Sequence, residues 1–181
     1  MAKQVDKTYS LIARHFDETR VAYWKSVKGV LESLGPGSLV LDCGCGNGKY
    51  SRLREDLCFL SFDFTLGLVE IAARGGQSLG GYFLGSVVTI PVRDKCVDCA
   101  ICVAVLHHVV EAGVALREIL RCTREKAVVT LWAEEQEKKK KWVQVGETDY
   151  LVPWLDKYTG ETVMRWYRLY TRGMAEALCS G

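Results

Sequence analysis

The sequence has little of what would place it in a specialised class of protein. Proline occurs only 3 times in 181 residues, and 24 basic residues nearly balance 22 acidic ones. The near-neutral charge excludes a uniformly basic protein that coats nucleic acid, so any nucleic-acid site must be local. Intrinsic disorder is also excluded, because 49% of the residues are hydrophobic and can form a core. The length suits one domain.

Long apolar stretches and a cysteine framework are missing as well. The longest apolar run, 97–106, contains Asp98 and is about half a membrane span, and residues 1–7 lack the apolar core of a signal peptide. Eight cysteines are too few for a disulfide scaffold. Cys96 and Cys99 lack a second Cys or His pair at zinc spacing. We expect no membrane segment, no metal in this chain and core thiols. The protein should be cytoplasmic, with the nucleus as a second location.

Short apolar runs alternate with amphipathic stretches through the middle of the chain. The pattern predicts strands at 38–43, 58–63, 97–105 and 127–132 and helices at 66–74 and 112–122. Two helices are expected before them, at 5–15 and 27–34. This order predicts an α/β fold with a doubly wound, mainly parallel sheet covered on both faces.

The sequence of residues 42–49, Asp-Cys-Gly-Cys-Gly-Asn-Gly-Lys, connects a predicted strand to the segment that follows it. A phosphate-binding P-loop would need glycine at Cys43 and Ser or Thr at Tyr50. A dinucleotide fingerprint would need its third glycine one residue later. The remaining pattern, Asp-x-Gly-x-Gly-x-Gly, is typical of class I methyltransferases that bind S-adenosylmethionine. Asp63 ends the next predicted strand, where a carboxylate can bind ribose hydroxyls. A tight turn without a ligand is the alternative.

Longer blocks resemble the eukaryotic tRNA wobble-uridine methyltransferases that esterify 5-carboxymethyluridine. The likeness runs from about Tyr9 to Gly173 and is carried by the blocks 12–20, 42–49, 98–108, 132–136, 152–154 and 165–170. It implies a class I, Rossmann-like methyltransferase fold with S-adenosylmethionine as methyl donor and S-adenosylhomocysteine as product. The cofactor-binding residues that we expect are Asp42, Gly44, Gly46, Gly48, Asp63, Ser86 and Val103.

The chain departs from that family in two places. The family usually has an acid after the third strand to bind the adenine amino group, where this sequence has Ser86. The family also continues into a C-terminal antiparallel hairpin, which we expect to be absent here because the sequence ends at Gly181. The expected single domain, 1–181, has four parts. They are N-terminal helices at 1–37, a cofactor-binding core at 38–133, an insertion at 134–162, and a C-terminal strand and helix at 163–181.

The reaction implied by the resemblance sets specific chemical demands. A carboxylate has a pKa of about 4, so it is ionised at neutral pH and needs no general base. Catalysis then depends on desolvating and aligning it, and a cation or donor must hold the oxygen that does not react. The candidates for this catalytic group are His15, Arg20, His107 and His108. Helix capping or core packing is the alternative for each histidine, and a solvated charge for Arg20.

A basic and aromatic segment near the end of the sequence bears on the substrate. Residues 138–172 contain eight Lys or Arg and four Asp or Glu, with tryptophans between them. This mixture is typical of phosphate contact combined with base stacking, although a solvated insertion with its aromatics on the core is the alternative. The RNA contacts that we expect are Trp132, Arg165, Arg168 and Tyr170, with core burial left open for Trp132.

The resemblance also implies a partner, a small zinc-binding activator protein that forms a heterodimer and adds a strand beside the sheet edge. The candidate edge is the strand near Tyr82–Leu84, because an apolar edge strand is an aggregation hazard when left open. With tRNA as substrate, the primary interpretation is the catalytic subunit of a tRNA carboxyl methyltransferase. Two alternatives stay open: a methyltransferase for a small-molecule acid or quinone, and a non-catalytic RNA-binding relative.

Overall fold

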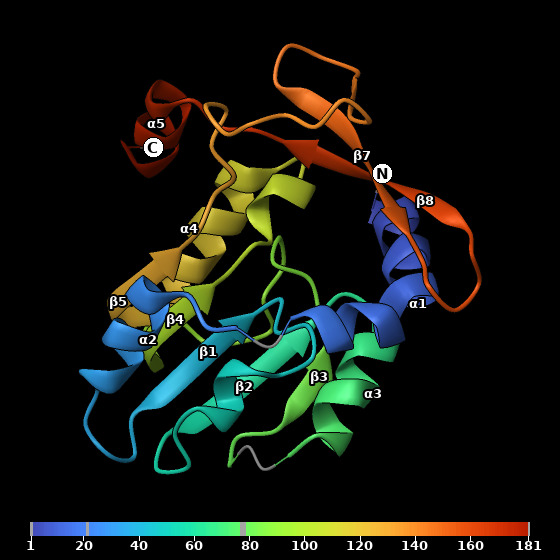
Figure 1. The fold of residues 1–181 in the computed structure, drawn as a ribbon. Coiled ribbons are helices and arrows are strands. Elements are labelled where there is room, and N and C mark those ends of the chain that lie inside the picture. Colours follow the sequence, from blue (N-terminus) through green and yellow to red (C-terminus); the bar gives the residue numbers. More distant parts are fainter. Residues whose placement is uncertain (1, 21, 77–78, 181) are drawn as a thin grey trace.

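The computed structural model describes residues 2–20, 22–76 and 79–180, with side chains from Thr8 onward. Its strands are β1 (Leu39–Cys43), β2 (Cys58–Asp63), β3 (Tyr82–Leu84), β4 (Val97–Cys102) and β5 (Thr123–Val129). These five strands are all parallel and lie in the order β3-β2-β1-β4-β5 (Figure 1). The predicted doubly wound parallel sheet is confirmed.

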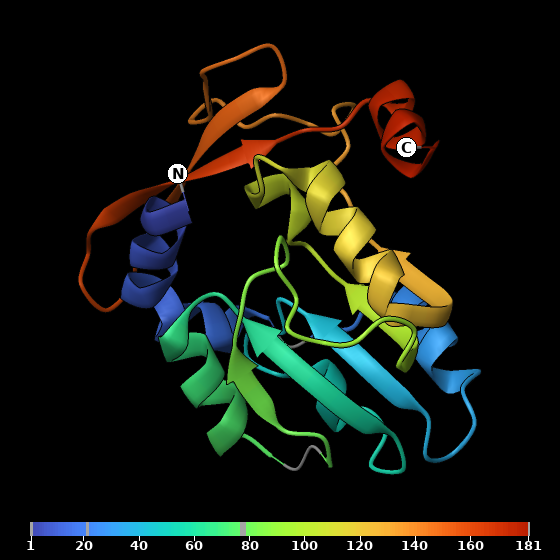
Figure 2. The same ribbon diagram turned by 180° about the vertical axis from the view of Figure 1, so that it is seen from behind.

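Both faces of this sheet are covered, because side chains alternate along the strands. Val40, Phe59 and Cys99 pack with Val27 and Leu31 of helix α2 (Lys25–Glu32) on one face. The neighbouring residues of the same strands face the other way and pack on α4 (Ala112–Cys122). Figures 1 and 2 show α2 and α4 on opposite faces of the sheet. The sheet interior is therefore a continuous apolar layer, as the short apolar runs predict.

Helix prediction was most successful inside the alternating region. Helix α3 (Leu66–Arg74) and helix α4 have the predicted limits. Helix α1 (Ala2–Thr19) extends beyond the predicted 5–15. It packs against α3 and against the C-terminal part of the chain, as its residues Tyr9, Ile12 and Ala13 contact Leu68.

The predicted limits of two strands were wrong. Strand β4 ends at Cys102 instead of residue 105, because the chain turns away from the sheet and Ala104 adopts a positive φ of 58°. Strand β5 begins at Thr123 and ends at Val129, whereas the prediction was 127–132. Arg124, Glu125 and Lys126 near its start are exposed and charged, so their hydropathy does not mark them as strand, although Lys126 pairs with Cys99 of β4.

A second, antiparallel sheet lies beside the carboxyl ends of the parallel strands (Figure 1). It consists of β6 (Val143–Gln144), β7 (Asp149–Leu155) and β8 (Thr162–Arg168). The segment 134–162, predicted as an insertion, thus contains β6 and β7, and β7 pairs with the strand β8 that follows. Helix α5 (Arg172–Ser180) then packs against α4. Within the described ranges, no strand pairs with the outer edge of β5.

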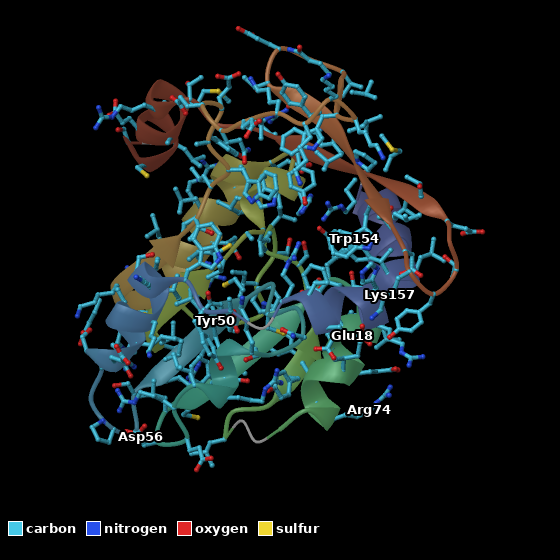
Figure 3. All side chains as sticks on the ribbon, in the orientation of Figure 1. Glu18, Tyr50, Asp56, Arg74, Trp154 and Lys157 are labelled. Carbon is cyan, nitrogen blue, oxygen red and sulfur yellow. The ribbon has the colours of Figure 1, made fainter. Side chains whose placement is uncertain are left out.

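The two sheets are connected through α1 and through an aromatic layer. Strand β8 contacts both α1 and the short helix η2 (Leu106–His108) that follows β4. Tyr150 and Tyr167 of the antiparallel sheet form a cluster with Trp132, which follows β5. Figure 3 labels Trp154, Lys157 and Glu18 at the junction of α1 with the β7–β8 hairpin. These contacts place the hairpin over the end of the parallel sheet where α/β proteins have their sites.

The described residues contain no group of three or more potential metal ligands and no helix long and apolar enough to cross a membrane. All eight cysteines are free thiols. Cys99 and Cys102 are fully buried in β4, which confirms their prediction as core residues.

Candidate active site

The backbone of the glycine loop after β1 lies close to a side chain from another segment. Gly44 has φ of +74° and Gly46 has φ of +56°. A Cβ atom added to Gly44 would lie 2.4 Å from Cγ2 of Val105, in the segment after β4. Only glycine satisfies both the backbone conformation and this contact, so the loop remains open toward the space in front of the sheet.

Two carboxylates, those of Asp42 and Asp63, lie beside this loop and differ in their hydrogen bonding. Asp42 is buried and its Oδ2 atom has no hydrogen-bond partner. Burial, together with the neighbouring charge of Asp63, raises the pKa of Asp42 to about 7. Asp63 accepts hydrogen bonds from the backbone N–H groups of Gly46 and Thr65, both at 2.9 Å. Asp63 is thereby fixed in orientation, whereas Asp42 has an unused acceptor that a cation can bind.

A cavity of about 800 Å³ extends from the glycine loop to the antiparallel sheet. Its wall contains the carboxylates of Asp42 and Asp63 beside the glycine loop and aromatic rings, such as that of Tyr167, beside the antiparallel sheet. Ten of the residues predicted from the sequence lie in this wall: Arg20, Asp42, Gly44, Gly46, Asp63, Ser86, Val103, His107, His108 and Trp132. The residue that follows α1, the parallel sheet with its loops, and the segment after β5 each contribute to them, so the fold gathers distant parts of the chain around one space.

The two histidines of η2 are neutral. The Nδ1–H group of His108 donates to the carbonyl oxygen of Trp166, and its Nε2 accepts from the hydroxyl of Tyr9, both at 2.8 Å. Burial lowers the pKa of His108 to about 3, and it lowers the pKa of His107 well below the usual range. At neutral pH these histidines therefore supply no positive charge, so the role left to them in holding a carboxylate is that of a neutral donor. His107 stacks on Tyr167 with 4.8 Å between ring centroids, and its buried Nδ1 has no partner.

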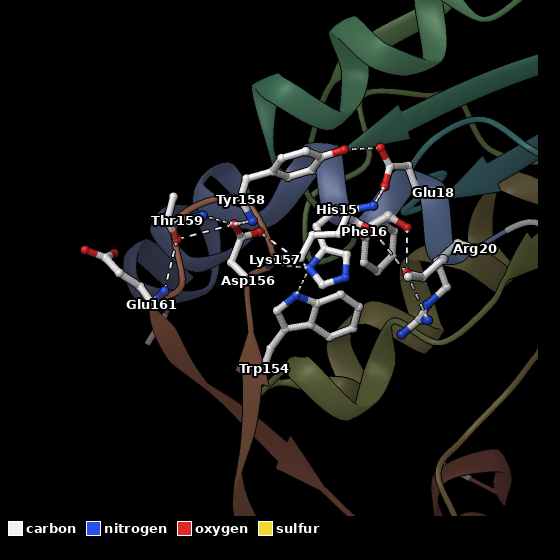
Figure 4. A network of polar contacts seen from close by, with 11 residues as sticks. His15, Phe16, Glu18, Arg20, Trp154, Asp156, Lys157, Tyr158, Thr159 and Glu161 are labelled. Atoms are coloured by element: carbon white, nitrogen blue, oxygen red, sulfur yellow. Dashed lines mark hydrogen bonds and ion pairs between the residues drawn. The ribbon is translucent and has the colours of Figure 1, made fainter.

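Arg20 provides positive charge in the cavity wall. Its guanidinium carbon lies 5.0 Å from the ring centre of Phe16 and 5.3 Å from that of Trp154. Its side chain makes a weak polar contact of 3.5 Å to the hydroxyl of Thr19. Figure 4 shows the guanidinium beside these rings. The side chain is held by its flat faces, which leaves N–H groups available for an anionic ligand.

His15 belongs to a polar network that fastens the β7–β8 turn to α1 (Figure 4). Its Nδ1 atom accepts from the indole N–H of Trp154 at 3.1 Å and from the backbone N–H of Lys157 at 3.2 Å. Asp156 lies 3.6 Å from the same nitrogen, and Glu18 pairs with Lys157. We call this network the hairpin clasp. His15 is not part of the cavity wall, so its placement gives no support to the catalytic role that we expected.

Comparison with known proteins identifies the family. Residues 41–131 match the methyltransferase domain family. A relative from Arabidopsis thaliana, named tRNA (carboxymethyluridine(34)-5-O)-methyltransferase, is 39% identical over 140 residues, which are 75% of this chain and 34% of the relative. A relative of the same name from Schizosaccharomyces pombe is 33% identical over 159 residues, which are 84% of this chain and 68% of the relative. The chain belongs to this methyltransferase family.

Solved structures show the same fold. A protein from Pyrococcus horikoshii OT3 aligns with this methyltransferase family member at a TM-score of 0.70 and 18% identity, over 96% of this chain and 84% of that one. A chain from the Haloferax volcanii complex of the Trm112 methyltransferase activator with a methyltransferase aligns at a TM-score of 0.59 and 20% identity, over 66% and 56% of the two chains. The Rossmann-like architecture of class I methyltransferases is thereby confirmed.

Four other predicted site residues of this methyltransferase lie outside the cavity wall. Gly48 has no room for a Cβ atom because Ala72 lies 2.9 Å away, so it allows packing of the loop on α3. Arg168 forms an ion pair with Asp149, with N–O distances of 2.9 and 3.2 Å. Tyr170 is buried and its hydroxyl donates to the carbonyl oxygen of Leu106. Its ring is therefore not exposed to RNA in this structure. Arg165, the fourth, is buried behind the wall.

Sequence reasoning missed several aromatic residues of the cavity wall. Among them are Tyr9, Phe16 and Tyr167. Tyr9 and Phe16 lie on the apolar stripe of α1, where helical spacing indicates core packing as readily as a site. Tyr167 is on β8, whose hairpin with β7 the hydropathy pattern does not indicate. The available signal was the position of Phe16 and Tyr167 inside the blocks that carry the family resemblance, and of Tyr9 where that likeness begins.

Proposed function

We propose that the chain is the catalytic subunit of a tRNA methyltransferase. It transfers the methyl group of S-adenosylmethionine to the carboxylate of 5-carboxymethyluridine at position 34, the wobble position, and forms the methyl ester. The observation that carries this proposal is the single cavity that joins the glycine loop and its acids to an aromatic, arginine-containing end. The names of the relatives give the acceptor.

The loop end fits S-adenosylmethionine, which supplies an electrophilic methyl group on its sulfonium. The unpartnered Oδ2 of Asp42 would accept a hydrogen bond from the α-ammonium group. Asp63, held by two backbone N–H groups, would bind the ribose hydroxyls. Arg20 would pair with the α-carboxylate. Ser86 and the apolar side chain of Val103 belong to the same wall, on the side where the adenine would lie.

The acceptor end suits a reaction that needs no base. A carboxylate is ionised at neutral pH, and the neutral His107 and His108 do not protonate it. Trp132, whose ring centroid lies 4.6 Å from that of the buried Tyr167, would stack on the uracil ring and exclude water. Desolvation of the acceptor oxygen and its alignment with the methyl group are then the main contributions of the protein.

The outer surface suits tRNA and a partner protein. Lys139, Lys140 and Lys141 are exposed at the start of the antiparallel sheet and would contact phosphates. Strand β3 is an edge of the parallel sheet, and its Leu84 is 56% exposed. A small zinc-binding activator would add a strand there and form a heterodimer. The Haloferax volcanii complex with Trm112 supports a partner of this kind. Such a complex would act on tRNA in the cytoplasm, with the nucleus as a second location.

The experiment is transfer of labelled methyl groups to bulk tRNA from cells that lack the endogenous activity. Reactions run with and without the activator, and the product is then treated with mild alkali. Label that is incorporated with the activator and released by alkali is expected, because an ester is base-labile. Alkali-stable label, or label found only on small-molecule acids when no RNA is present, would contradict the proposal.

A further inference from the structure

Arg165 is a buried cation that the fold itself does not neutralise. The residue is 6% exposed, and its Nε and Nη1 atoms are buried without a hydrogen-bond partner. Its guanidinium carbon lies 4.7 Å from the ring centre of Trp154 and 5.1 Å from that of Tyr167. The flat faces of the group are therefore covered by aromatic rings, while hydrogen-bonding groups at its edge are left unused.

Other arginines of the chain show how unusual this is. Arg168, on the same strand, is paired with Asp149, and Arg121 is paired with both Asp94 and Glu118. No carboxylate pairs with Arg165 in the part of the chain that the structure describes. Burying an ionised group without a counter-ion is costly, so the position is suited to an anion that comes from outside the chain.

The surroundings of Arg165 connect it to the cavity. Its charge opposes the rise that burial causes in the pKa of Tyr9, and it contributes to lowering the pKa values of His107 and His108. Tyr9, Tyr167 and both histidines line the cavity. The electrostatic effect of Arg165 therefore acts on the acceptor end, directly behind the residues that form the wall.

A second arginine shares the same tryptophan. Both Arg20 and Arg165 have their guanidinium carbons within 5.3 Å of the ring centre of Trp154. Two guanidinium groups on one ring repel each other, and neither has an acidic partner in the described residues. Two anionic groups would balance them. The proposed reaction brings two carboxylates into the cavity, one on the methyl donor and one on the acceptor.

We propose that the charge of Arg165, acting across the ring of Tyr167 on which it lies, attracts the carboxylate of the methyl acceptor and makes the site selective for an acid-bearing uridine. The inference rests on the proposed function and assigns the two charges: Arg20, in the cavity wall, to the donor, and Arg165, behind the wall, to the acceptor. The guanidinium draws the carboxylate to this end of the cavity, where one of its oxygens is directed at the methyl group.

The charge balance of the reaction agrees with this role. The free carboxylate oxygen attacks the methyl carbon, the new O–C bond forms as the S–C bond breaks, and the electron pair of the broken bond stays on sulfur. No proton is transferred. The acceptor loses its negative charge when the ester forms, so the charge of Arg165 no longer attracts it. The same interaction that selects the acid therefore also favours release of the product.

The test compares Arg165→Gln and Arg165→Met with the wild-type protein in complex with its activator. The wild type should bind tRNA carrying 5-carboxymethyluridine more tightly than tRNA carrying the neutral methyl ester. The Gln variant should lose this preference and show a KM for the acid-bearing tRNA raised by about tenfold or more. Its affinity for S-adenosylhomocysteine should stay within about twofold of the wild type. Because the charge has no internal partner, the Met variant should melt at the same or a higher temperature.

The matched control is Arg124→Gln, which changes an arginine paired with Asp98 away from the cavity and should leave the preference for the acid intact. A Gln variant of Arg165 that keeps this preference would overturn the inference even if the wild type forms the ester. If the wild type forms no ester, stabilisation by the nucleoside 5-carboxymethyluridine is measured by thermal unfolding. Stabilisation that depends on Arg165 would then support the site although the proposed function fails, and stabilisation equal in both proteins would refute the site.

Discussion

The donor end and the acceptor end of the cavity are built in different ways. At the donor end, the loop 42–48 and Asp63 lie close together in the sequence, and backbone N–H groups hold the Asp63 carboxylate. At the acceptor end, Tyr9, His108 and Tyr167 come from three distant segments and are held by ring contacts and side-chain hydrogen bonds. A short motif can specify the first end, whereas the second exists only after the hairpin has folded onto α1.

The two ends also differ in their charge. The donor end contains acids, one of which has an unused acceptor at Asp42. The acceptor end contains neutral histidines and the unpaired Arg165. In the proposed reaction each end would therefore be completed by a ligand group of opposite charge, an ammonium at one and a carboxylate at the other. The following variants test whether the ends are as independent as this comparison indicates.

Loss of the Asp63 carboxylate should have the largest effect on the donor end. We expect Asp63→Ala to weaken binding of S-adenosylhomocysteine by at least about 100-fold, because two charge-assisted hydrogen bonds to the ribose would be lost. Isothermal titration calorimetry measures this. Asp98→Ala is the control, since Asp98 also accepts a backbone hydrogen bond, from Leu39 at 2.8 Å, but does not line the cavity. Equal losses in both variants would contradict the assignment.

The contact between the glycine loop and the segment after β4 can be tested through stability. Gly44→Ala should lower the free energy of unfolding by about 2–4 kcal/mol, because the added methyl meets Val105 and φ is positive. Gly29→Ala, in α2, meets no atom within 4 Å and should raise it by about 0.5–1 kcal/mol. Urea unfolding monitored by circular dichroism compares them. A tolerated Gly44→Ala would show that the loop is not constrained as described.

The raised pKa of Asp42 predicts a pH dependence at the donor end. A ligand ammonium binds the ionised carboxylate, so affinity for S-adenosylhomocysteine should rise about tenfold from pH 6 to pH 8 and level off above. Without ligand, the same rise in pH lowers the stability of the folded protein. Since the folded pKa lies above the unfolded one, this contribution to stability is lost as the pH rises through about 7. Calorimetry across this range should give a flat profile for Asp42→Asn. A slope that persists in that variant would assign the titration to another group.

Weakening the hairpin clasp should affect the acceptor end alone. His15→Ala removes the acceptor of the Trp154 indole and of the Lys157 backbone N–H. We expect amide hydrogen exchange in residues 155–162 to become about tenfold faster, while exchange in β1 and affinity for S-adenosylhomocysteine stay unchanged. The control Lys28→Ala removes an exposed ion pair with Glu32 on α2. Faster exchange throughout the main sheet would show that the two ends fold as one unit.

The smallest effect is expected at Arg168, on the outer side of the antiparallel sheet. Arg168→Ala should weaken tRNA binding a few-fold and reduce its salt dependence, because one phosphate contact would be lost. Affinity for S-adenosylhomocysteine should not change. Filter binding at several salt concentrations measures both properties, with Arg124→Ala as the control. An unchanged salt slope would assign Arg168 a purely structural role through its pair with Asp149.

Much of the donor end could be predicted because its information is local. The order of strand, glycines, helix, strand and acid indicates the loop and Asp63 within a short window, and the structure places Asp42, Gly44 and Gly46 in the cavity wall. The limits of β4 and β5 were predicted less well, since the first depends on a turn at Ala104 and the second on pairing of exposed, charged residues. Hydropathy carries no information on either.

The acceptor end shows what needs the tertiary structure. His15 and His108 are equal candidates in the sequence, yet one fastens a hairpin and the other lies in the cavity wall. The aromatic segment after residue 138 could have been a solvated insertion. Its pairing as β7 and β8 became visible only in the fold, because antiparallel pairing depends on which residues meet across the sheet.

By itself, the sequence determined the fold class, the glycine loop with its acid, and the family. These properties follow from periodicity and from motifs that need only neighbours along the chain. The tertiary structure decided the charge states of buried side chains and their hydrogen-bond and ion-pair partners. Arg165 and Arg168 are three residues apart on β8 and so point to opposite sides; one is buried without a counter-ion and the other pairs with Asp149. Burial and long-range contacts set these differences, and neither is encoded in the local pattern.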